Sequence, residues 1–185
     1  TLRHSSAASD VYKRQLSKSA KNTLNIEDKI QTLGKDFANS KGSMFLGRGY
    51  SYPIALEGAL KLKELAYVHA EGYPAGEMKH GPLALIEEGM PVVVIAPRDE
   101  HYKKTISNMQ EVISRGAKVL LITNKSTDEI YSENIWEQIE VDAISDELIP
   151  FLTTIPLQKL AYYSALDKGY DIDKPRNLAK SVTVE

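Results

Sequence analysis

The stretch Val92-Val93-Val94-Ile95-Ala96 is apolar at every position and lacks the polar alternation of a strand with one solvated face. Such runs are typical of parallel sheets, whose strands are covered by helices on both faces. Val119-Leu120-Leu121-Ile122 repeats the pattern, and Ser43-Met44-Phe45-Leu46 is a shorter run of the same kind. Ile139-Glu140-Val141 is a possible fourth strand. These runs predict a buried, mainly parallel sheet.

Segments with helical spacing separate these strands. Apolar residues recur at helical intervals from Ile26 to Phe37, and further helices are expected over residues 53–68, 101–114 and 148–166. Strand and helix therefore alternate, which places helices on both faces of a parallel sheet. We predict an α/β fold, a three-layer αβα sandwich of the flavodoxin-like kind. Residues 69–82, rich in glycine and proline, are expected to be irregular apart from one helical turn.

The two ends of the chain differ from this core. Asp10-Val11-Tyr12-Lys13-Arg14-Gln15 resembles the in-frame translation of a sequencing-library adaptor. Residues 1–15 are therefore expected to be non-native or disordered, and in that case the natural chain continues upstream. Residues 16–40 are expected to form a leading helical segment and residues 41–170 the main domain. Residues 171–185 have no clear period and are expected to be an irregular C-terminal tail.

Composition excludes several functional classes. The 185 residues suit one domain, and 42% hydrophobic with 26% charged residues is the balance of a soluble globular protein. A net charge of −2 favours neither nucleic acid nor a membrane as a partner. No apolar run approaches the roughly 20 residues of a membrane span, and no secretory signal is recognisable. The absence of cysteine excludes disulfides and thiolate nucleophiles, and it is compatible with a cytoplasmic setting.

The segment 53–68 carries the most informative pattern. At about 100° per residue, Glu57, Lys61 and Glu64 fall within a strip about 60° wide on the predicted helix. Apart from Lys63, nearly every other direction is apolar. One interpretation is a pair of ordinary helical ion pairs, each contributing about 0.2–0.5 kcal/mol. The other is a cleft in which crowded carboxylates and an amine have shifted pKa values, as acid–base catalysts need. The residues alone leave both open.

The loop Gly47-Arg48-Gly49 follows a predicted strand and precedes a predicted helix. Such a loop can present backbone amides to an anion. Tyr52, however, stands where a dinucleotide fingerprint needs its third glycine, and no Walker lysine is present. A tight strand–helix turn is therefore the favoured interpretation over a phosphate cradle.

Two single residues have both an ordinary and a functional interpretation. His80 follows Glu77 at a spacing that can bind metal, but no second copy exists and Gly81-Pro82 ends any helix, so we reject a metal site. By default His80 is a solvated loop residue, and proton transfer is the alternative. Lys180 in the tail is by default solvated. As a nucleophile it would need its ammonium destabilised by burial or by neighbouring cations.

Three stretches together resemble one family. They are Phe45–Glu64, His69–Ala84 and the tail Pro175–Glu185. They are similar to the second sugar-isomerase (SIS) domain of the glutamine–fructose-6-phosphate aminotransferases, which make glucosamine 6-phosphate. The resemblance extends from about residue 26 to the end of the chain. It implies an SIS-type sandwich and a sugar-phosphate substrate, with neither a metal nor an organic cofactor.

The resemblance also implies a role for each matching residue. Lys180 would form a Schiff base with C2 of open-chain fructose 6-phosphate, and Glu64 would move a proton between C1 and C2. Lys61 would assist that transfer beside the sugar hydroxyls. His80 would assist ring opening from the neighbouring subunit of a homodimer. Three residues would bind or position the sugar and the tail: Glu57 as a support, Ala179 through its backbone, and Arg176 by placing the tail.

The chain differs from the family in two ways that limit the activity expected of it. The glutaminase domain of these enzymes uses a cysteine, and this chain has none. The Ser/Thr-rich phosphate-binding loop of the first isomerase domain is also not recognisable. We therefore expect these domains on the same longer polypeptide and little activity from this fragment alone. A non-catalytic sugar-phosphate sensor and a stand-alone isomerase or deglycase are the alternatives. The retained Lys61, Glu64, His80 and Lys180 speak against a sensor, and the tail speaks against a stand-alone enzyme through the resemblance.

Overall fold

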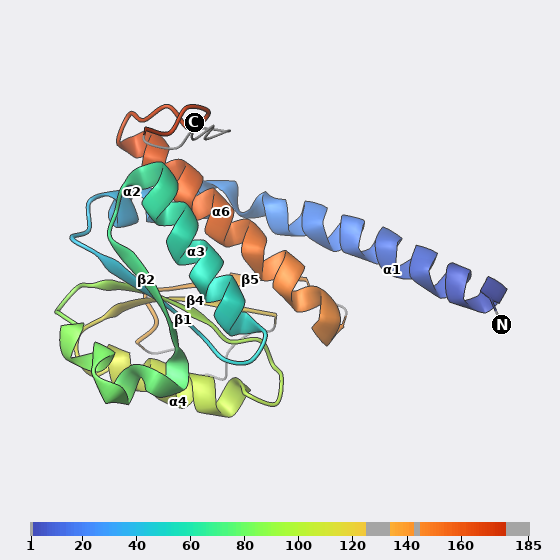
Figure 1. The fold of residues 1–185 in the computed structure, drawn as a ribbon, viewed down its shortest axis with the longest axis horizontal. Helices are drawn as coiled ribbons and strands as arrows, with labels where there is room; N and C mark the ends of the chain where they lie inside the picture. Colours follow the sequence, from blue (N-terminus) through green and yellow to red (C-terminus); the bar gives the residue numbers. More distant parts are fainter. Residues whose placement is uncertain (1, 125–133, 143–144, 177–185) are drawn as a thin grey trace, which may run out of the picture.

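The computed structural model describes residues 2–124, 134–142 and 145–176, with side chains from residue 10 onward. Its centre is a five-stranded sheet in the order β2-β1-β3-β4-β5, in which every neighbouring pair is parallel (Figure 1). The strands are β1 (Ser43–Gly47), β2 (Ala70–Pro74), β3 (Pro91–Ile95), β4 (Lys118–Thr123) and β5 (Glu137–Glu140). The parallel sheet expected from the apolar runs is confirmed.

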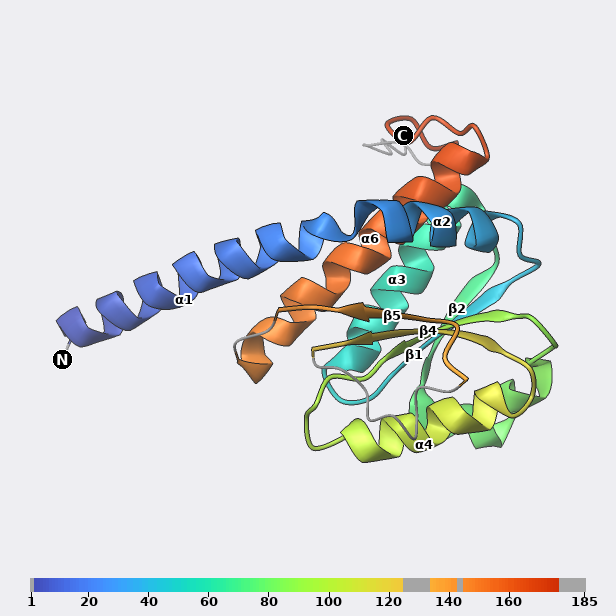
Figure 2. The same ribbon diagram turned by 180° about the vertical axis from the view of Figure 1, so that it is seen from behind.

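Helices cover both faces of the sheet, as Figures 1 and 2 show. One face carries α2 (Glu27–Ala38), α3 (Ser51–Ala66) and α6 (Ile149–Asp167). The other carries α4 (Tyr102–Ile113) with the short 3₁₀ helices η2 (Ala75–His80) and η3 (Pro82–Leu85). This confirms the three-layer sandwich. In the described part of the chain, no helix has the length and apolar character that crossing a bilayer requires.

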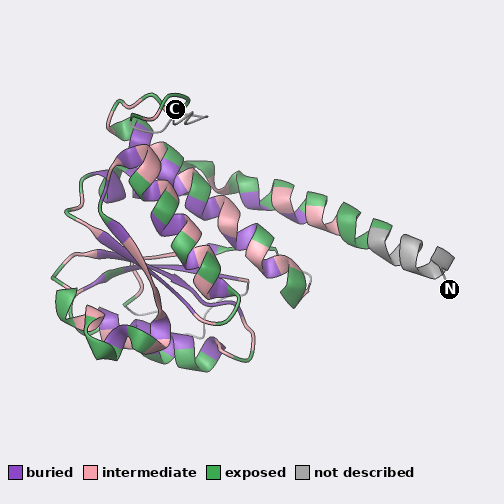
Figure 3. Ribbon diagram, in the orientation of Figure 1, coloured by how far each residue is buried: buried purple, intermediate pink, exposed green. Residues whose placement is uncertain are grey.

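Each strand in the middle of the sheet contributes side chains to two hydrophobic cores, because successive side chains point to opposite faces. On β1, Phe45 packs with the α2–α3–α6 side, whereas Met44 and Leu46 pack with the α4 side. All five residues of β1 and of β3 are buried (Figure 3). Burial on both faces therefore accounts for the unbroken apolar runs in these strands.

Small side chains let α3 lie close to its neighbours. Its inward face buries Ala55, Gly58, Ala59 and Leu62. A Cβ atom at Gly58 would lie 2.9 Å from side-chain carbons of both Leu157 on α6 and Phe45 on β1. The helix is thus held against the sheet and α6 at once, and its polar residues are left on the outer surface.

The expectation for residues 69–82 was half wrong. Residues 75–80 are helical, as a six-residue 3₁₀ helix of about two turns rather than the one turn expected, and Ala70–Pro74 is strand β2, paired in parallel with β1. An edge strand tolerates polar residues and a terminal proline, because only one of its sides is paired. Gly72 has a packing reason as well: its Cβ would lie 3.0 Å from the backbone of Leu56 on α3.

A long N-terminal helix precedes the sandwich. Helix α1 (Leu2–Thr23) is followed by η1 (Leu24–Ile26), where Asn25 leaves the helical conformation, and it projects away from the body (Figures 1 and 2). Among its described side chains, Leu16 and Ala20 in the C-terminal part pack against the core. The adaptor-like residues 10–15 lie within α1, where Val11 and Tyr12 are about half exposed. That residues 1–15 are non-native stays a prediction.

The crossing of α2 and α6 yields a stability test at Gly34. A Cβ atom there would lie 2.6 Å from Cβ of Tyr163 and 3.0 Å from its carbonyl carbon, and the Ser164 hydroxyl donates to the Gly34 carbonyl at 3.0 Å. We expect Gly34→Ala to lower the free energy of unfolding by about 1–3 kcal/mol, because the helices must separate. Urea unfolding followed by circular dichroism measures this.

The exposed neighbour Lys35 provides the control, and Lys35→Ala should change the free energy of unfolding by less than about 0.5 kcal/mol. Helix propensity alone would make Gly34→Ala stabilising by about 1 kcal/mol. A stabilised variant would therefore contradict the tight crossing.

Candidate active site

The three charged residues of the predicted strip meet on the outer face of α3. Nζ of Lys61 donates to Oε2 of Glu64 at 2.7 Å and lies 3.8 Å from Oε1 of Glu57. The side chains of Lys61, Glu57 and Glu64 are 31%, 35% and 28% exposed. The prediction from helical spacing that these three residues share one face of the helix is confirmed. Because Lys61 lies between two carboxylates, both of its neighbours compete for the same ammonium.

The strip favours the charged form of its lysine. The hydrogen bond to Glu64 is the main reason that the pKa of Lys61 is raised above its ordinary value, and the charges of Glu57 and Glu64 add to it. Partial burial acts in the opposite direction but does not outweigh them. Lys61 is therefore an ammonium near neutral pH. The ammonium binds one oxygen of Glu64, and a carboxylate has a second oxygen that can still accept a proton.

A shallow groove of about 510 Å³ runs between α3 and α6 beside the strip. Of the three charged strip residues, Lys61 alone lines it, together with Glu27, Leu65, Gln158, Lys159, Tyr162 and Tyr163. Glu57 and Glu64 face outward beside it, next to the exposed Leu56 and Leu60. The groove is open to solvent, so the described residues do not form an enclosed site.

The loop after β1 lies at the point where the strand order reverses, between β1 and β3, which is the usual ligand site in such sheets. Here the loop closes on the start of α3: the Ser51 N–H donates to the Arg48 carbonyl at 2.9 Å and the Tyr52 N–H to the Gly49 carbonyl at 3.2 Å. A Cβ on Gly47 would lie 2.2 Å from the Ser51 oxygen. These contacts support the tight-turn interpretation.

Arg48 has a bracing role that the sequence did not indicate. Its Nη2 and Nε donate to Oδ1 of Asn108 on α4 at 2.9 and 3.3 Å. The same guanidinium lies against Gly76 in η2, where an added Cβ would be 2.6 Å from Nη2. Arg48 therefore connects the β1 loop to α4 and to the short helix that ends at His80. The glycine at position 76 was the one local signal of this contact.

His80 lies away from the strip. It ends η2 on the α4 side of the sheet, whereas α3 covers the opposite side. Its ring is 74% exposed, with Nε2 3.9 Å from Oε2 of Glu77. Within residues 2–124, 134–142 and 145–176, no group of three or more histidine and acidic side chains is arranged to hold a metal ion. The structure does not bring His80 to Glu64 within one chain, so its role from a neighbouring subunit stays a prediction.

The beginning of the tail returns to the end of α3. The Arg176 N–H donates to the Tyr67 hydroxyl at 2.6 Å, and the Arg176 guanidinium carbon lies 4.1 Å from the centre of the Tyr67 ring. Tyr67 directly follows the last residue of α3 and was not singled out by the sequence. Ala179 and Lys180 lie outside the described residues.

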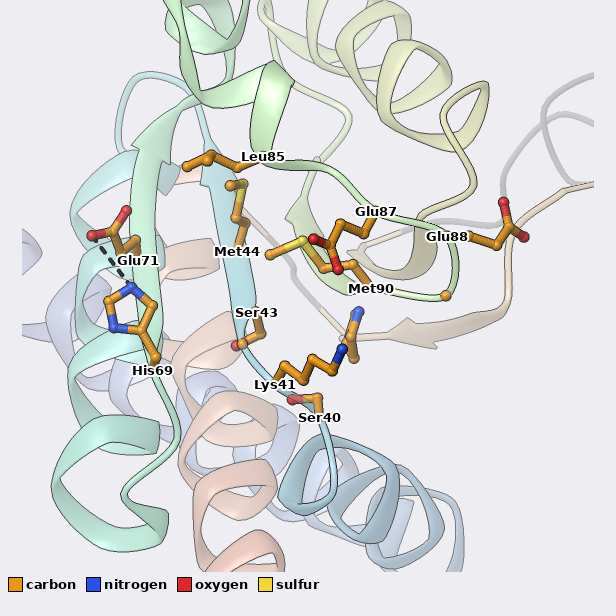
Figure 4. A pocket seen from close by; sticks show the side chains of 13 residues that line it. Ser40, Lys41, Ser43, Met44, His69, Glu71, Leu85, Glu87, Glu88 and Met90 are labelled. Atoms are coloured by element: carbon orange, nitrogen blue, oxygen red, sulfur yellow. Dashed lines mark ion pairs between the residues drawn. The ribbon is translucent and has the colours of Figure 1, made fainter.

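A second cavity, of about 490 Å³, lies at the amino ends of β1, β2 and β3 (Figure 4). Nε2 of His69 lies 3.6 Å from Oε1 of Glu71 on one side of it. Other residues that line it include Lys41, Met44, Leu85, Glu87 and Met90. Ligand sites of parallel sheets normally lie at the opposite, carboxyl edge. This cavity contains none of the site residues predicted from the sequence.

Comparison with known proteins identifies the fold family. The family model of the SIS domain matches residues 36–167. The chain belongs to the SIS domain family. The tagatose-6-phosphate ketose/aldose isomerase of Escherichia coli shares the fold of this SIS domain, with a TM-score of 0.76 over 92% of this chain and 48% of that one, at 22% identity.

Three relatives with higher sequence identity are aminotransferases of one kind. The glutamine–fructose-6-phosphate aminotransferases (isomerizing) of Bartonella quintana and Bacteroides thetaiotaomicron are 52% and 54% identical to this SIS domain, over 88% and 89% of it. The solved C-terminal domain of glucosamine-fructose-6-phosphate aminotransferase from Francisella tularensis has 43% identity and a TM-score of 0.80, covering 87% of this chain and 45% of that one. The resemblance seen in the sequence is confirmed. The chain spans 27% of the length of each of the two aminotransferases.

The Lys61 ammonium gives a direct test of the strip. We expect Glu64→Gln to lower the pKa of Lys61 in this SIS domain, because it removes the hydrogen-bonded carboxylate, and Glu57→Gln to lower it less. A carbon NMR titration of the Lys61 ε-methylene measures both. Since the folded pKa is raised, the pair stabilises the fold below the unfolded value near 10.5, and this stability is lost as pH rises through the folded pKa. Equal shifts in both variants would contradict the leading role of Glu64.

Proposed function

We propose that this SIS domain is the second isomerase domain of a longer, homodimeric, cytoplasmic polypeptide that converts fructose 6-phosphate to glucosamine 6-phosphate with glutamine-derived ammonia. The observation that carries the proposal is the 2.7 Å pair of Lys61 and Glu64 on an outward helix face. It lies in a chain about half identical to aminotransferases of that name. The reaction would supply amino-sugar biosynthesis.

The proposed chemistry begins at the tail. The Lys180 amine attacks C2 of the open-chain ketose, water leaves, and an imine forms. Ammonia then adds to C2 and Lys180 leaves, so that the nitrogen remains on the sugar. An imine withdraws electrons and acidifies the hydrogen on C1, which lets a carboxylate remove it. Glu64 takes that proton from C1 as the imine nitrogen gains a proton, which gives an enolamine, and then returns the proton to C2. The C1 hydroxyl gives up its own proton, which balances the one gained by nitrogen, so that an aldehyde is left at C1 and an amine at C2.

Lys61 and Glu57 support this transfer. As negative charge develops on the oxygen at C1, the Lys61 ammonium is the nearest cation to Glu64, and it can turn from the carboxylate to that oxygen. Glu57, 3.8 Å from Lys61 on its other side, keeps the ammonium charged and in place. His80 of a second copy assists ring opening, since η2 faces away from α3 in its own chain. Arg176 and Ala179 place the tail.

The proposed nucleophile is tested on the longer polypeptide. We expect borohydride to trap fructose 6-phosphate on Lys180, because reduction fixes the imine, and peptide mass spectrometry locates the label. Lys180→Arg should give no adduct, and Lys174→Arg, a matched change in the tail, should trap normally. Label on another lysine in the wild type would refute the role of Lys180.

The same assay distinguishes the role of Glu64, the proposed base, from that of Lys180, the proposed nucleophile. Glu64→Gln should still form the trapped adduct, because imine formation needs the amine rather than the carboxylate. Its formation of glucosamine 6-phosphate should fall by about 10²–10⁴, the usual contribution of a positioned general base. Wild-type turnover in this variant would assign the proton transfer elsewhere.

The SIS domain alone is expected to turn over fructose 6-phosphate at least about a hundredfold more slowly than the longer polypeptide. Remote binding energy, here from the phosphate, normally positions the reacting carbons, and the groove beside α3 is open. Parallel assays with ammonia as the nitrogen source measure the ratio, and circular dichroism verifies that the domain is folded. Equal rates would show that the phosphate grip lies within this chain.

A further inference from the structure

Tyr67 has a backbone conformation that calls for an explanation. Its φ of 52° and ψ of 34° are left-handed, and among the described residues it is the one non-glycine with positive φ. Its N–H donates to the Lys63 carbonyl at 3.2 Å and ends α3. Glycine is the usual residue at this place in a helix end, because it has no Cβ to strain. A tyrosine there strains the backbone where glycine would not, and such outliers often mark functional positions.

The Tyr67 ring joins the end of α3 to the tail. It contacts the Tyr170 ring edge-on at 4.8 Å between centroids, and the Arg176 guanidinium lies over it at 4.1 Å. Its hydroxyl accepts the Arg176 N–H at 2.6 Å. The Arg176 guanidinium also lies 6.0 Å from the Tyr170 ring. Two residues of the segment that follows α6, Tyr170 and Arg176, thus contact one side chain at the end of α3.

Hydrogen bonds and apolar packing hold the segment between α6 and Arg176 in place. The Tyr170 N–H donates to the Ala165 carbonyl at 3.0 Å. The Asp171 carboxylate accepts the N–H groups of Asp173 and Lys174 at 3.0 and 3.2 Å. Ile172 packs against the core of the α3–α6 side. Tyr67 therefore holds the last described residue of the tail.

We propose that Tyr67, with Tyr170, is a positioning latch that holds the tail at the end of α3 and so keeps Lys180 near Glu64. This proposal rests on the proposed function. Glu64 precedes Tyr67 by three residues, about 4.5 Å along the helix axis. Lys180 follows Arg176 by four residues, so its Cα stays within about 14 Å of the latched position. Glu64 and Lys180, the two groups of the proposed reaction, are therefore each only a few residues from the contact between Tyr67 and Arg176.

Loss of the latch has a calculable effect. Without it, Ile172 is the last described residue of the tail that packs against the core. The number of residues between the last described anchor and Lys180 then grows from four (176 to 180) to eight (172 to 180). Effective concentration falls roughly as the −3/2 power of tether length, so doubling the tether lowers it about threefold. Lost orientation of the amine lowers the rate further. The half-saturating concentration of the sugar should not change, because Tyr67 and Tyr170 are not among the residues assigned to binding it.

Two substitutions separate the latch from simple folding. Tyr67→Gly removes the ring and hydroxyl and places the favoured residue at the left-handed position, so the helix end is retained. Tyr67→Phe keeps the ring contacts and removes only the hydroxyl that accepts the Arg176 N–H. Lys174→Ala is the control, since it removes a cation from the same segment without a contact to Tyr67.

The test uses the longer polypeptide with two readouts. The first is hydrogen exchange of the Arg176 amide; the second is the borohydride-trapping rate at Lys180 over a range of fructose 6-phosphate concentrations. For Tyr67→Gly we expect faster exchange and a maximal trapping rate at least about threefold lower, with an unchanged half-saturating concentration. Tyr67→Phe should show faster exchange and a trapping rate between those of Tyr67→Gly and the wild type. Lys174→Ala should match the wild type.

Unchanged exchange in Tyr67→Gly overturns the latch itself. Faster exchange with wild-type trapping overturns its positioning role, as does a loss that appears only as a higher half-saturating concentration. Absence of any adduct at Lys180 in the wild type overturns the proposed function and with it the positioning role, whereas the exchange readout still decides whether Tyr67 holds the tail.

Discussion

The close packing of α3 between the sheet and α6 is the constraint on which the rest of the structure depends. Its inward face is made of Ala55, Gly58, Ala59 and Leu62, and Gly58 leaves no room for a side chain against Leu157 and Phe45. Rotation of the helix about its axis would insert larger residues into this contact and bury charged ones, which is costly without partners. The helix therefore has one favourable orientation, with its acidic strip outward.

With α3 in this orientation, the proposed proton-transfer groups and the proposed nucleophile lie on different parts of the chain. The strip projects from a helix that packs against both the sheet and α6, and its Lys61 and Glu64 are already paired at 2.7 Å. The amine that we assign to the reaction belongs instead to the tail, which returns to the end of the same helix through Tyr67 and Arg176. A fixed proton-transfer group and a tethered nucleophile suit a reaction in which an imine forms first and a proton moves afterwards.

Most of the fold could be predicted from the sequence, because strands buried on both faces leave unbroken apolar runs such as Val92–Ala96. Strand β2 was missed, since an edge strand needs only one paired side and includes Gly72 and Pro74. The strip was predictable because helical spacing is local. The contact between Arg176 and Tyr67 spans 109 residues and leaves no periodic signal, so only the folded chain reveals it.

The most direct test is a crystal structure of the longer polypeptide soaked with fructose 6-phosphate. Our account predicts continuous density from Nζ of Lys180 to C2 of the sugar, with a carboxylate oxygen of Glu64 within about 3.2 Å of C1 or C2. Sugar bound elsewhere, with Lys180 in solvent and Glu64 still paired only to Lys61, would contradict the account.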